Sequence, residues 1–302
     1  EDLFIPQRFR AKRETLGTRV AEAKYRPFPD LAMDWERVFE PQGAGSEEGC
    51  AVCRIEVSQD NSTVLGRTGE IPEGVAPQRI CHLCESFGAL ARQICRGPGQ
   101  ELWMQIGDRP NMLGTSKADQ DGWDTLLARM TGFEYRFYDS IPGGPGIRFV
   151  INRTDFLTMG AEGFKFIANV TPVVEKDDVA YLKGKGLDDK EMPRTGDIRS
   201  FTLMAHAAVE AEAIEQIGVL RMDVDNLGYT FSQGMPQMNL PRLSALSQAM
   251  DLFFSGYLNE LVSRYSQNDL YIIYAGGDDL FVVGAWHHLP ELAEAVRNTF
   301  KI

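Results

Sequence analysis

The chain has 302 residues, of which 43% are hydrophobic and 25% charged, a composition typical of globular proteins. Its formal net charge of −12 argues against nonspecific electrostatic binding of nucleic acid, because the phosphate backbone is itself anionic. No apolar run approaches the roughly 20 residues that cross a bilayer, and the N-terminus lacks a signal-peptide layout. We therefore expect a cytoplasmic protein with no membrane partner.

The first two segments differ in their cysteine content. Residues 1–45 carry mixed charge and several prolines, which predicts an extended or partly helical lead-in segment. Residues 46–100 hold two CxxC pairs, CAVC (Cys50, Cys53) and CHLC (Cys81, Cys84). The following ESFGALARQICR has apolar residues at helical spacing, so this segment predicts a cysteine module followed by a helix.

The two cysteine pairs predict a structural zinc site. Each CxxC can present both sulfurs to one tetrahedral ion, and two pairs complete four thiolates. A redox dithiol and disulfides are the alternatives, but a redox site needs only one pair and a cytosolic chain disfavours disulfides. Four thiolates leave no open coordination position, so this zinc should not be catalytic. His82, inside the second pair, is interpreted as a spectator.

The middle of the chain predicts strands and then a boundary. Residues 101–173 contain the β-like runs LWMQIG, FEYRFYD, IRFVIN and FKFIANV, which predict a strand-rich α+β region. The sequence IPGGPG separates the second run from the third, as a hairpin turn would. Residues 174–200 are charged, contain glycine and predict a linker or mobile loop.

Residues 201–302 predict a strand, a long helix and a β-hairpin in that order. The strand-like GVLRMDVDN follows a helix-like run, and a long helix is expected from about 241 to 265. The apolar runs LYIIY and LFVVGAW then flank AGGDD, which reads as a hairpin with Asp278 and Asp279 at or just after its tip. The last element is a helix from Leu289.

The acidic residues of this segment predict a divalent metal site. Residues two apart on a strand share a face, so we expect Asp223 and Asp225 to point the same way. Carboxylates at a strand end, facing a hairpin tipped by two more, suit Mg²⁺ or Mn²⁺. Two such ions can activate an attacking hydroxyl and stabilise the leaving oxygen of a phosphoryl displacement. The alternative is a surface hairpin with solvated acids beside an unrelated strand. The predicted ligands are Asp223, Val224, Asp278 and Asp279.

Backbone groups next to these acids predict a nucleotide site. The tight turn expected after the strand would let N–H groups cradle a triphosphate, and the hairpin glycines would allow close backbone approach. The predicted nucleotide-binding residues are Asp225, Asn226, Leu227, Gly228, Gly276 and Gly277. The order of elements indicates an α+β, ferredoxin-like βαββαβ palm, as in polymerases and nucleotide cyclases, whose last strand would lie beyond residue 302.

Together, GVLRMDVDNLG, the YAGGDDLF hairpin and the upstream CxxC pairs resemble the large palm (GGDD) subunit of type III-A CRISPR interference complexes. The resemblance implies synthesis of cyclic oligoadenylate from ATP by 3′–5′ nucleotidyl transfer in antiviral defence. It also implies guide RNA, target RNA and other subunits as partners, with bound target RNA switching the activity on. Carried onto this sequence, the catalytic acids are Asp223, Asp278 and Asp279, and Asp225 is a helper.

One departure from the family pattern and two alternatives qualify this hypothesis. The family commonly begins with an HD nuclease domain, but no histidine here is followed by Asp, so this piece is not expected to be that nuclease. His287 and His288 predict a surface turn. We expect the isolated piece to be unstable or inactive. The alternatives are a non-catalytic scaffold for guide RNA and partner subunits, and a diguanylate-cyclase-like GTP enzyme, a class that usually carries Glu at the position of Asp279.

Overall fold

The computed structural model describes residues 4–26, 34, 40, 48–64, 78–95, 101–108, 122–187, 192–210, 212–266 and 268–300. The chain divides into two compact units, one of residues 1–85 with 226–248 and the other of residues 86–225 with 249–302. Most of the predicted lead-in after residue 26 and part of the predicted linker lie outside the described residues. No helix in the described ranges has both the length and the apolar character needed to span a bilayer.

The first unit contains one long helix and a small cysteine-lined core. Helix α1 (Pro6–Tyr25) begins with proline in its first turn, where the missing N–H costs no helical hydrogen bond. Strand β1 (Ser62–Val64) pairs antiparallel with β2 (Arg79–Cys81). Cys50, Val57 and Cys81 are buried together beside this pair. The same unit includes α8 (Leu227–Tyr229) and the π-helix η2 (Thr230–Gly234).

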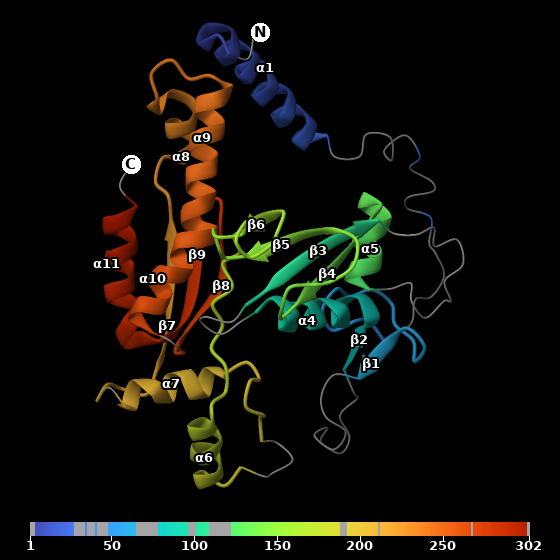
Figure 1. Ribbon diagram of the computed structural model, residues 1–302, viewed down its shortest axis with the longest axis vertical. Coiled ribbons are helices and arrows are strands. Elements are labelled where there is room, and N and C mark those ends of the chain that lie inside the picture. The colour runs from blue at the N-terminus through green and yellow to red at the C-terminus, as the bar shows by residue number, and fades with distance from the viewer. Residues whose placement is uncertain are drawn as a thin grey trace. The chain divides into compact units, whose positions relative to one another are not determined.

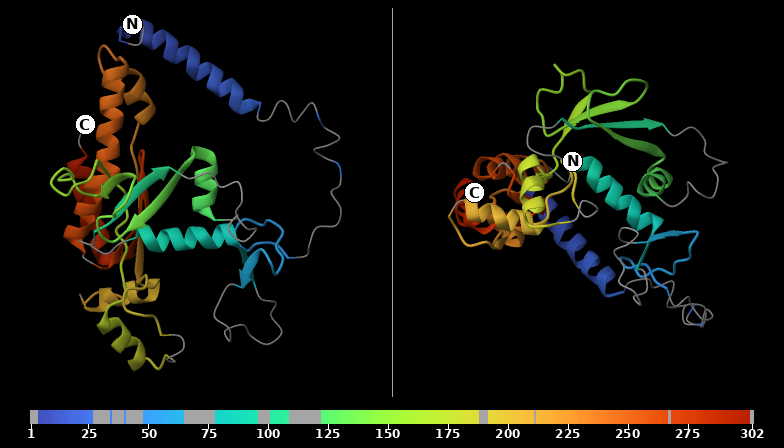
Figure 2. Two further views of the ribbon diagram at one scale, coloured as in Figure 1. Left: turned by 45° about the vertical axis from the view of Figure 1, so that its right-hand side comes forward. Right: turned by 90° about the horizontal axis from the view of Figure 1, so that it is seen from below.

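Helix α4 (His82–Ile94) follows β2 directly and confirms the predicted helix after the cysteines. A four-stranded sheet comes next, with the order β4, β3, β5, β6. Helix α5 (Trp123–Thr131) contacts β4 (Figure 2). The strands are β3 (Trp103–Asp108), β4 (Phe133–Tyr138), β5 (Ile147–Ile151) and β6 (Gly163–Lys165).

The predicted hairpin between β4 and β5 is wrong. Both strands pair antiparallel with β3, one on each side, so they run in the same direction and a tight turn cannot join them. Burial explains the arrangement, because Trp103 of β3 and Val150 of β5 are both almost fully buried in one cluster. The run FKFIANV also supplies only a short strand, which ends at Lys165.

The segment predicted as a charged linker contains regular structure within its described residues, 174–187 and 192–200. It contains helix α6 (Lys176–Gly184), which begins with a capping box between Glu175 and Asp178. Arg199 forms ion pairs with Asp178 at 2.6 Å and with Asp269 at 2.5 Å. Asp178 and Arg199 are therefore charges used in internal ion pairs, which composition alone could not distinguish from solvated charges.

The palm is a three-stranded antiparallel sheet with the order β7, β9, β8 (Figure 1). Its strands are β7 (Ile217–Asp223), β8 (Leu270–Gly276) and β9 (Asp279–Ala285). One helical run precedes β8, made of α9 (Leu240–Asp251), the π-helix η3 (Leu252–Tyr257) and α10 (Leu258–Tyr265). The 3₁₀ turn η4 (Trp286–His288) and α11 (Leu289–Thr299) follow β9. The predicted strand, helix, hairpin and helix are confirmed.

The two faces of this sheet are covered differently. On one face α11 lies so close to β7 that a Cβ on Gly218 would be 2.5 Å from Leu289. Leu280 and Val282 of β9 have no exposed surface on that face. On the other face α7 (Phe201–Glu210) packs Ala207 and Ala208 against Ala285, at the end of the sheet far from the hairpin tip. Toward the hairpin end of this second face, Val219, Arg221 and Asp223 are exposed among the described residues.

Candidate active site and metal centre

The four CxxC cysteines converge in the structure as predicted from their spacing. Their Sγ atoms all lie within 4.8 Å of one another, and the Sγ atoms of Cys53 and Cys81 are 3.7 Å apart. A tetrahedron with Zn–S arms of about 2.3 Å has edges of about 3.8 Å, so this spacing is that of a zinc site. His82 is not a member of the group.

The local fold explains how the cysteines meet. Cys50 and Cys53 lie in a tight turn closed by hydrogen bonds from Arg54 N to Cys50 O and from Cys50 N to Ile55 O. Arg54 has a positive φ of 63°, which reverses the chain there. Cys81 ends β2, and Cys84 lies in the first turn of α4.

The thiol electrostatics also fit a bound cation. Backbone hydrogen bonds from Cys53 and Cys81 lower the pKa of the Cys50 thiol to about 6. Burial raises the pKa of Cys84 to about 12 and also raises that of Cys81. One thiolate is therefore favoured at neutral pH, whereas the others need a neighbouring positive charge to ionise. Zinc supplies such a charge, and the donor set fits it.

The predicted catalytic acids come together through strand pairing. Asp223 is the last residue of β7 and Asp279 the first of β9, and the two are direct partners in the β7–β9 ladder. Direct partners place their Cβ atoms about 4.5–5.5 Å apart on the same face. Asp279 also pairs with Gly276 of β8. The third acid, Asp278, lies in the turn between β8 and β9.

The glycine hairpin is a two-residue turn, formed by Gly277 and Asp278 between the paired residues Gly276 and Asp279. Gly277 has a φ of 66°, whereas the φ of Asp278 is not positive. This is the pattern of a type II′ turn, in which glycine occupies the first central position. The turn therefore explains Gly277 and fixes Asp278 beside the cross-strand pair.

The three acids lack an ion-pair partner among the described residues. No side-chain hydrogen bond or ion pair joins Asp223, Asp278 or Asp279 to another residue in the described part of the chain. Unneutralised carboxylates at one corner of a sheet offer the hard oxygen donors that Mg²⁺ and Mn²⁺ prefer. In the described ranges, however, only the cysteines form a group of ligand atoms all within 4.8 Å, so the aspartates are more widely spaced.

The residues after β7 adopt a different arrangement from the prediction. The strand ends at Asp223, so Asp225 lies in a turn rather than on the same strand face, and half-buried Val224 lies between them. Asn226 has a φ of 56° and precedes α8, in which Leu227 and Gly228 are the first two residues. The tight turn predicted there is thus present as a left-handed residue followed by a short helix.

The structure adds three side chains that the sequence reading did not single out. Arg221, Phe281 and Tyr274 occupy the row of the sheet next to the Asp223–Asp279 row, because Arg221 pairs with Phe281 and Phe281 with Tyr274. The signal was present in the sequence, since Arg221 precedes Asp223 by two residues and Phe281 follows Asp279 by two. Only the strand register joins them into one row.

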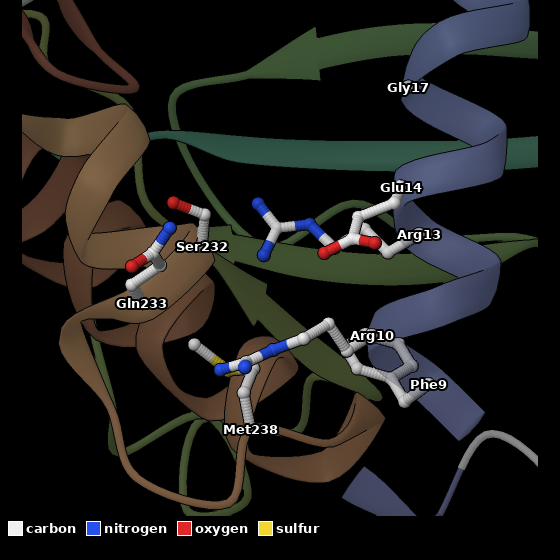
Figure 3. Close-up of a pocket in the computed structure, with 8 residues that line it drawn as sticks. All are labelled: Phe9, Arg10, Arg13, Glu14, Gly17, Ser232, Gln233 and Met238. Carbon is white, nitrogen blue, oxygen red and sulfur yellow. The ribbon is translucent and has the colours of Figure 1, made fainter. Parts of the chain in front are cut away.

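A cavity of about 330 Å³ lies within the first unit (Figure 3). The guanidinium group of Arg13 donates a hydrogen bond to the carbonyl of Phe231 beside it. None of the predicted site residues lines this cavity. The residues around it are Phe9, Arg10, Arg13, Glu14, Gly17, Ser232, Gln233 and Met238.

Comparison with known proteins gives the same assignment for the palm. Residues 216–302 match the family described as Cas10/Cmr2, second palm domain. The Cas10/Csm1 protein of Methanocaldococcus jannaschii, a single-strand-specific deoxyribonuclease of CRISPR subtype III-A, is 28% identical over 97% of this chain. Over residues 216–302 the chain is similar to the second palm domain of Cas10/Cmr2 proteins. It spans 36% of the length of that relative, and an Enterococcus italicus Cas10/Csm1 is 40% identical over 29% of the chain and 11% of its own length.

Solved Csm1 structures resemble the chain over part of its length. A Csm1–Csm4 cassette in complex with cA3 has a TM-score of 0.43 at 23% identity, covering 72% of this chain and 27% of the other. A Csm1–Csm4 cassette with one ATP has a TM-score of 0.38 at 26% identity, covering 56% and 23%. The similarity to Cas10-type proteins is seen in the palm family match over residues 216–302 and in the 28% identity to the Methanocaldococcus jannaschii protein.

Proposed function

We propose that this chain forms the zinc module and catalytic palm of an RNA-guided type III CRISPR complex, in which the palm makes cyclic oligoadenylate from ATP. The observation that carries the proposal is the direct pairing of Asp223 with Asp279, with Asp278 in the adjoining turn. Two strand ends and a two-residue turn thereby hold three unneutralised carboxylates at one corner of the palm sheet.

The proposed reaction is a nucleotidyl transfer. The 3′-oxygen of one ATP attacks the α-phosphorus of a second ATP, a P–O bond forms, and the bond to pyrophosphate breaks while the hydroxyl proton is released. Repetition and ring closure give the cyclic product. Divalent ions bound at Asp223, Asp278 and Asp279 would help to activate the hydroxyl and to stabilise the leaving oxygen. Asp223, Asp278 and Asp279 would hold these ions at one corner of the sheet.

The surrounding residues have supporting roles in this proposal. Val224 lies between Asp223 and the turn that contains Asp225, close in sequence to the metal ligands. Asn226, Leu227 and Gly228 would offer backbone N–H groups to the triphosphate, and the exposed Gly277 leaves room for a ligand beside the acids. The zinc module would act structurally, and target RNA bound by partner subunits would switch the palm on.

The test uses the full-length subunit in its assembled complex. Labelled ATP or GTP is incubated with Mg²⁺ or Mn²⁺, with and without target RNA, beside the Asp278→Ala/Asp279→Ala variant. Oligoadenylate that requires both the RNA and the two aspartates supports the proposal. Product from GTP alone would favour the diguanylate-cyclase-like alternative. No product from either nucleotide, with RNA binding intact, would leave a zinc-stabilised scaffold.

A further inference from the structure

The open face of the palm sheet presents a row of exposed side chains next to the acids. Because α7 covers only the Ala285 end of this face, the strand residues nearer the hairpin tip remain accessible. Val219 is 60% exposed and Tyr274 43% exposed, and Arg221 is also exposed. These residues lie on the two edge strands, β7 and β8, and belong to one solvent-exposed face, as antiparallel sheets often have.

Two aromatic rings in this row are already arranged for stacking. Tyr274 and Phe281 are direct cross-strand partners, and their rings are parallel to within 3° with centroids 5.8 Å apart. Aromatic side chains of this kind bind nucleobases by stacking, which is worth about 1–3 kcal/mol per base. Their row lies two residues from the Asp223–Asp279 row, roughly 7 Å along the strands. This is close to the span between the sugar hydroxyl and the base of one nucleotide.

Arg221 is the single basic residue in the three strands of this sheet. It lies directly opposite Phe281, at the end of the aromatic row. Its guanidinium has no hydrogen bond or ion pair with any residue in the described part of the chain. An unpaired guanidinium beside stacked rings offers donors in the fork geometry that matches phosphate.

We propose that Arg221, Phe281 and Tyr274 bind the nucleotide that supplies the attacking 3′-hydroxyl. This inference rests on the proposed function and specifies its acceptor site. The base stacks on the Tyr274–Phe281 pair, which brings the ribose 3′-hydroxyl toward Asp223 and Asp279. The 5′-phosphates are repelled by those carboxylates and turn to Arg221, the cation on this face. The nucleotide that donates its α-phosphate would lie instead at the turn that follows β7, beside the divalent ions that the acids would hold.

The experiment isolates the acceptor site in the full-length complex with target RNA. 3′-Deoxy-ATP serves as the donor, because it lacks the attacking hydroxyl, and the acceptor is either AMP or adenosine. Formation of one defined dinucleotide gives kcat and KM for each acceptor. We expect the wild-type complex to prefer AMP over adenosine by roughly tenfold in kcat/KM, the size of one charge-assisted contact. Arg221→Gln should abolish this preference, and Arg221→Lys should restore part of it.

The ring pair has its own prediction in the same assay. Tyr274→Ala should raise KM for AMP and adenosine alike by about tenfold, whereas Tyr274→Phe should behave as wild type. Arg264→Gln, an exposed arginine on α10, is the matched control and should leave every value unchanged. Thermal unfolding of each variant verifies that the palm is folded.

The outcomes separate this inference from the proposed function. A wild-type complex that cyclises ATP but uses AMP and adenosine equally, or uses neither, overturns the acceptor site. An AMP preference that survives Arg221→Gln in a folded variant does the same. If the wild-type complex makes no product from ATP, the proposed function is overturned instead. That result comes from the wild-type complex alone and needs no variant.

Discussion

Asp223 and Asp279 are direct partners across the β7–β9 ladder of the palm sheet. Their side chains therefore share one face at the end of the sheet, and Asp278 adjoins them in the turn. Like charges placed directly opposite each other destabilise a sheet. A pair held in this way without a protein cation stores a repulsion that a bound divalent ion would relieve.

This repulsion predicts a gain in stability when one carboxylate is neutralised. In buffer without divalent ions, Asp223→Asn should raise the free energy of unfolding by up to about 1 kcal/mol, while product formation by the full complex falls at least a hundredfold. Denaturant unfolding measures the first effect and labelled-ATP assays the second. With Mg²⁺ present the stability gain should vanish, because the ion stabilises the wild-type pair. A loss of stability without Mg²⁺ would contradict the pairing argument.

The hairpin glycines should respond differently to substitution. Gly277 has a φ of 66°, so Gly277→Ala forces an L residue into a strained backbone region and should cost about 1–3 kcal/mol of unfolding free energy. Gly276 has no such φ, and a Cβ there would meet nothing within 4 Å. Gly276→Ala is therefore the matched control, with an expected change in unfolding free energy below about 0.5 kcal/mol. Denaturant unfolding of both variants makes the comparison, and equal costs would refute the turn assignment.

Zinc binding should depend only on the thiols of the four clustered cysteines. Cys53→Ser or Cys84→Ser should reduce the zinc content from one ion per chain to well below one and melt the small core around Cys50 and Val57. Elemental analysis and thiol titration measure the two effects. Cys95→Ser is the control, since Cys95 lies outside the group and should leave zinc bound. A chelator should reproduce the effect of the Cys53 and Cys84 variants.

The buried ion pairs of Arg199 predict a pH-dependent stability. Arg199 is 11% and Asp178 6% exposed, so Arg199→Gln leaves a buried carboxylate without its partner and should cost about 3 kcal/mol at pH 7. Burial acts to raise the pKa of Asp269, but the His288 hydrogen bond and the Arg199 charge outweigh it, and that pKa lies below its usual value. Its stabilising contribution is present above about pH 4 and lost as pH falls through the lowered pKa.

The loss of unfolding free energy caused by Arg199→Gln should accordingly be smaller at acidic pH, because protonated carboxyl groups carry no charge for the guanidinium to neutralise. Denaturant unfolding at pH 7 and at about pH 3 makes the comparison. The matched control is Arg148→Gln, because the Arg148–Glu162 pair lies at the surface and surface pairs contribute less than about 1 kcal/mol. If the two variants lose the same unfolding free energy at pH 7, burial does not determine how much the Arg199 ion pairs stabilise the fold. His288 lies in a turn as predicted, the 3₁₀ turn η4, but it is half-buried there, with its Nε2 3.7 Å from a carboxylate oxygen of Asp269.

The sequence by itself determined the parts of the site whose geometry is local. A CxxC pair fixes two sulfurs within one turn, and GGDD between two apolar runs fixes a tight hairpin, so Cys50, Cys84, Asp278 and their neighbours were found from short motifs. The period of two along a strand placed Asp223 on a strand, but it placed Asp225 there too, and the strand in fact ends at Asp223. These patterns depend on residues only a few positions apart, which is why they predict structure reliably.

Only the tertiary structure decided the relationships between distant residues. The register that pairs Asp223 with Asp279 and sets Arg221 beside Phe281 joins segments more than fifty positions apart. The placement of β4 and β5 on opposite sides of β3, and the pairing of Arg199 with Asp269, also depend on which surfaces are buried together. Burial and strand register are properties of the whole fold, because each is chosen by the packing of every element at once.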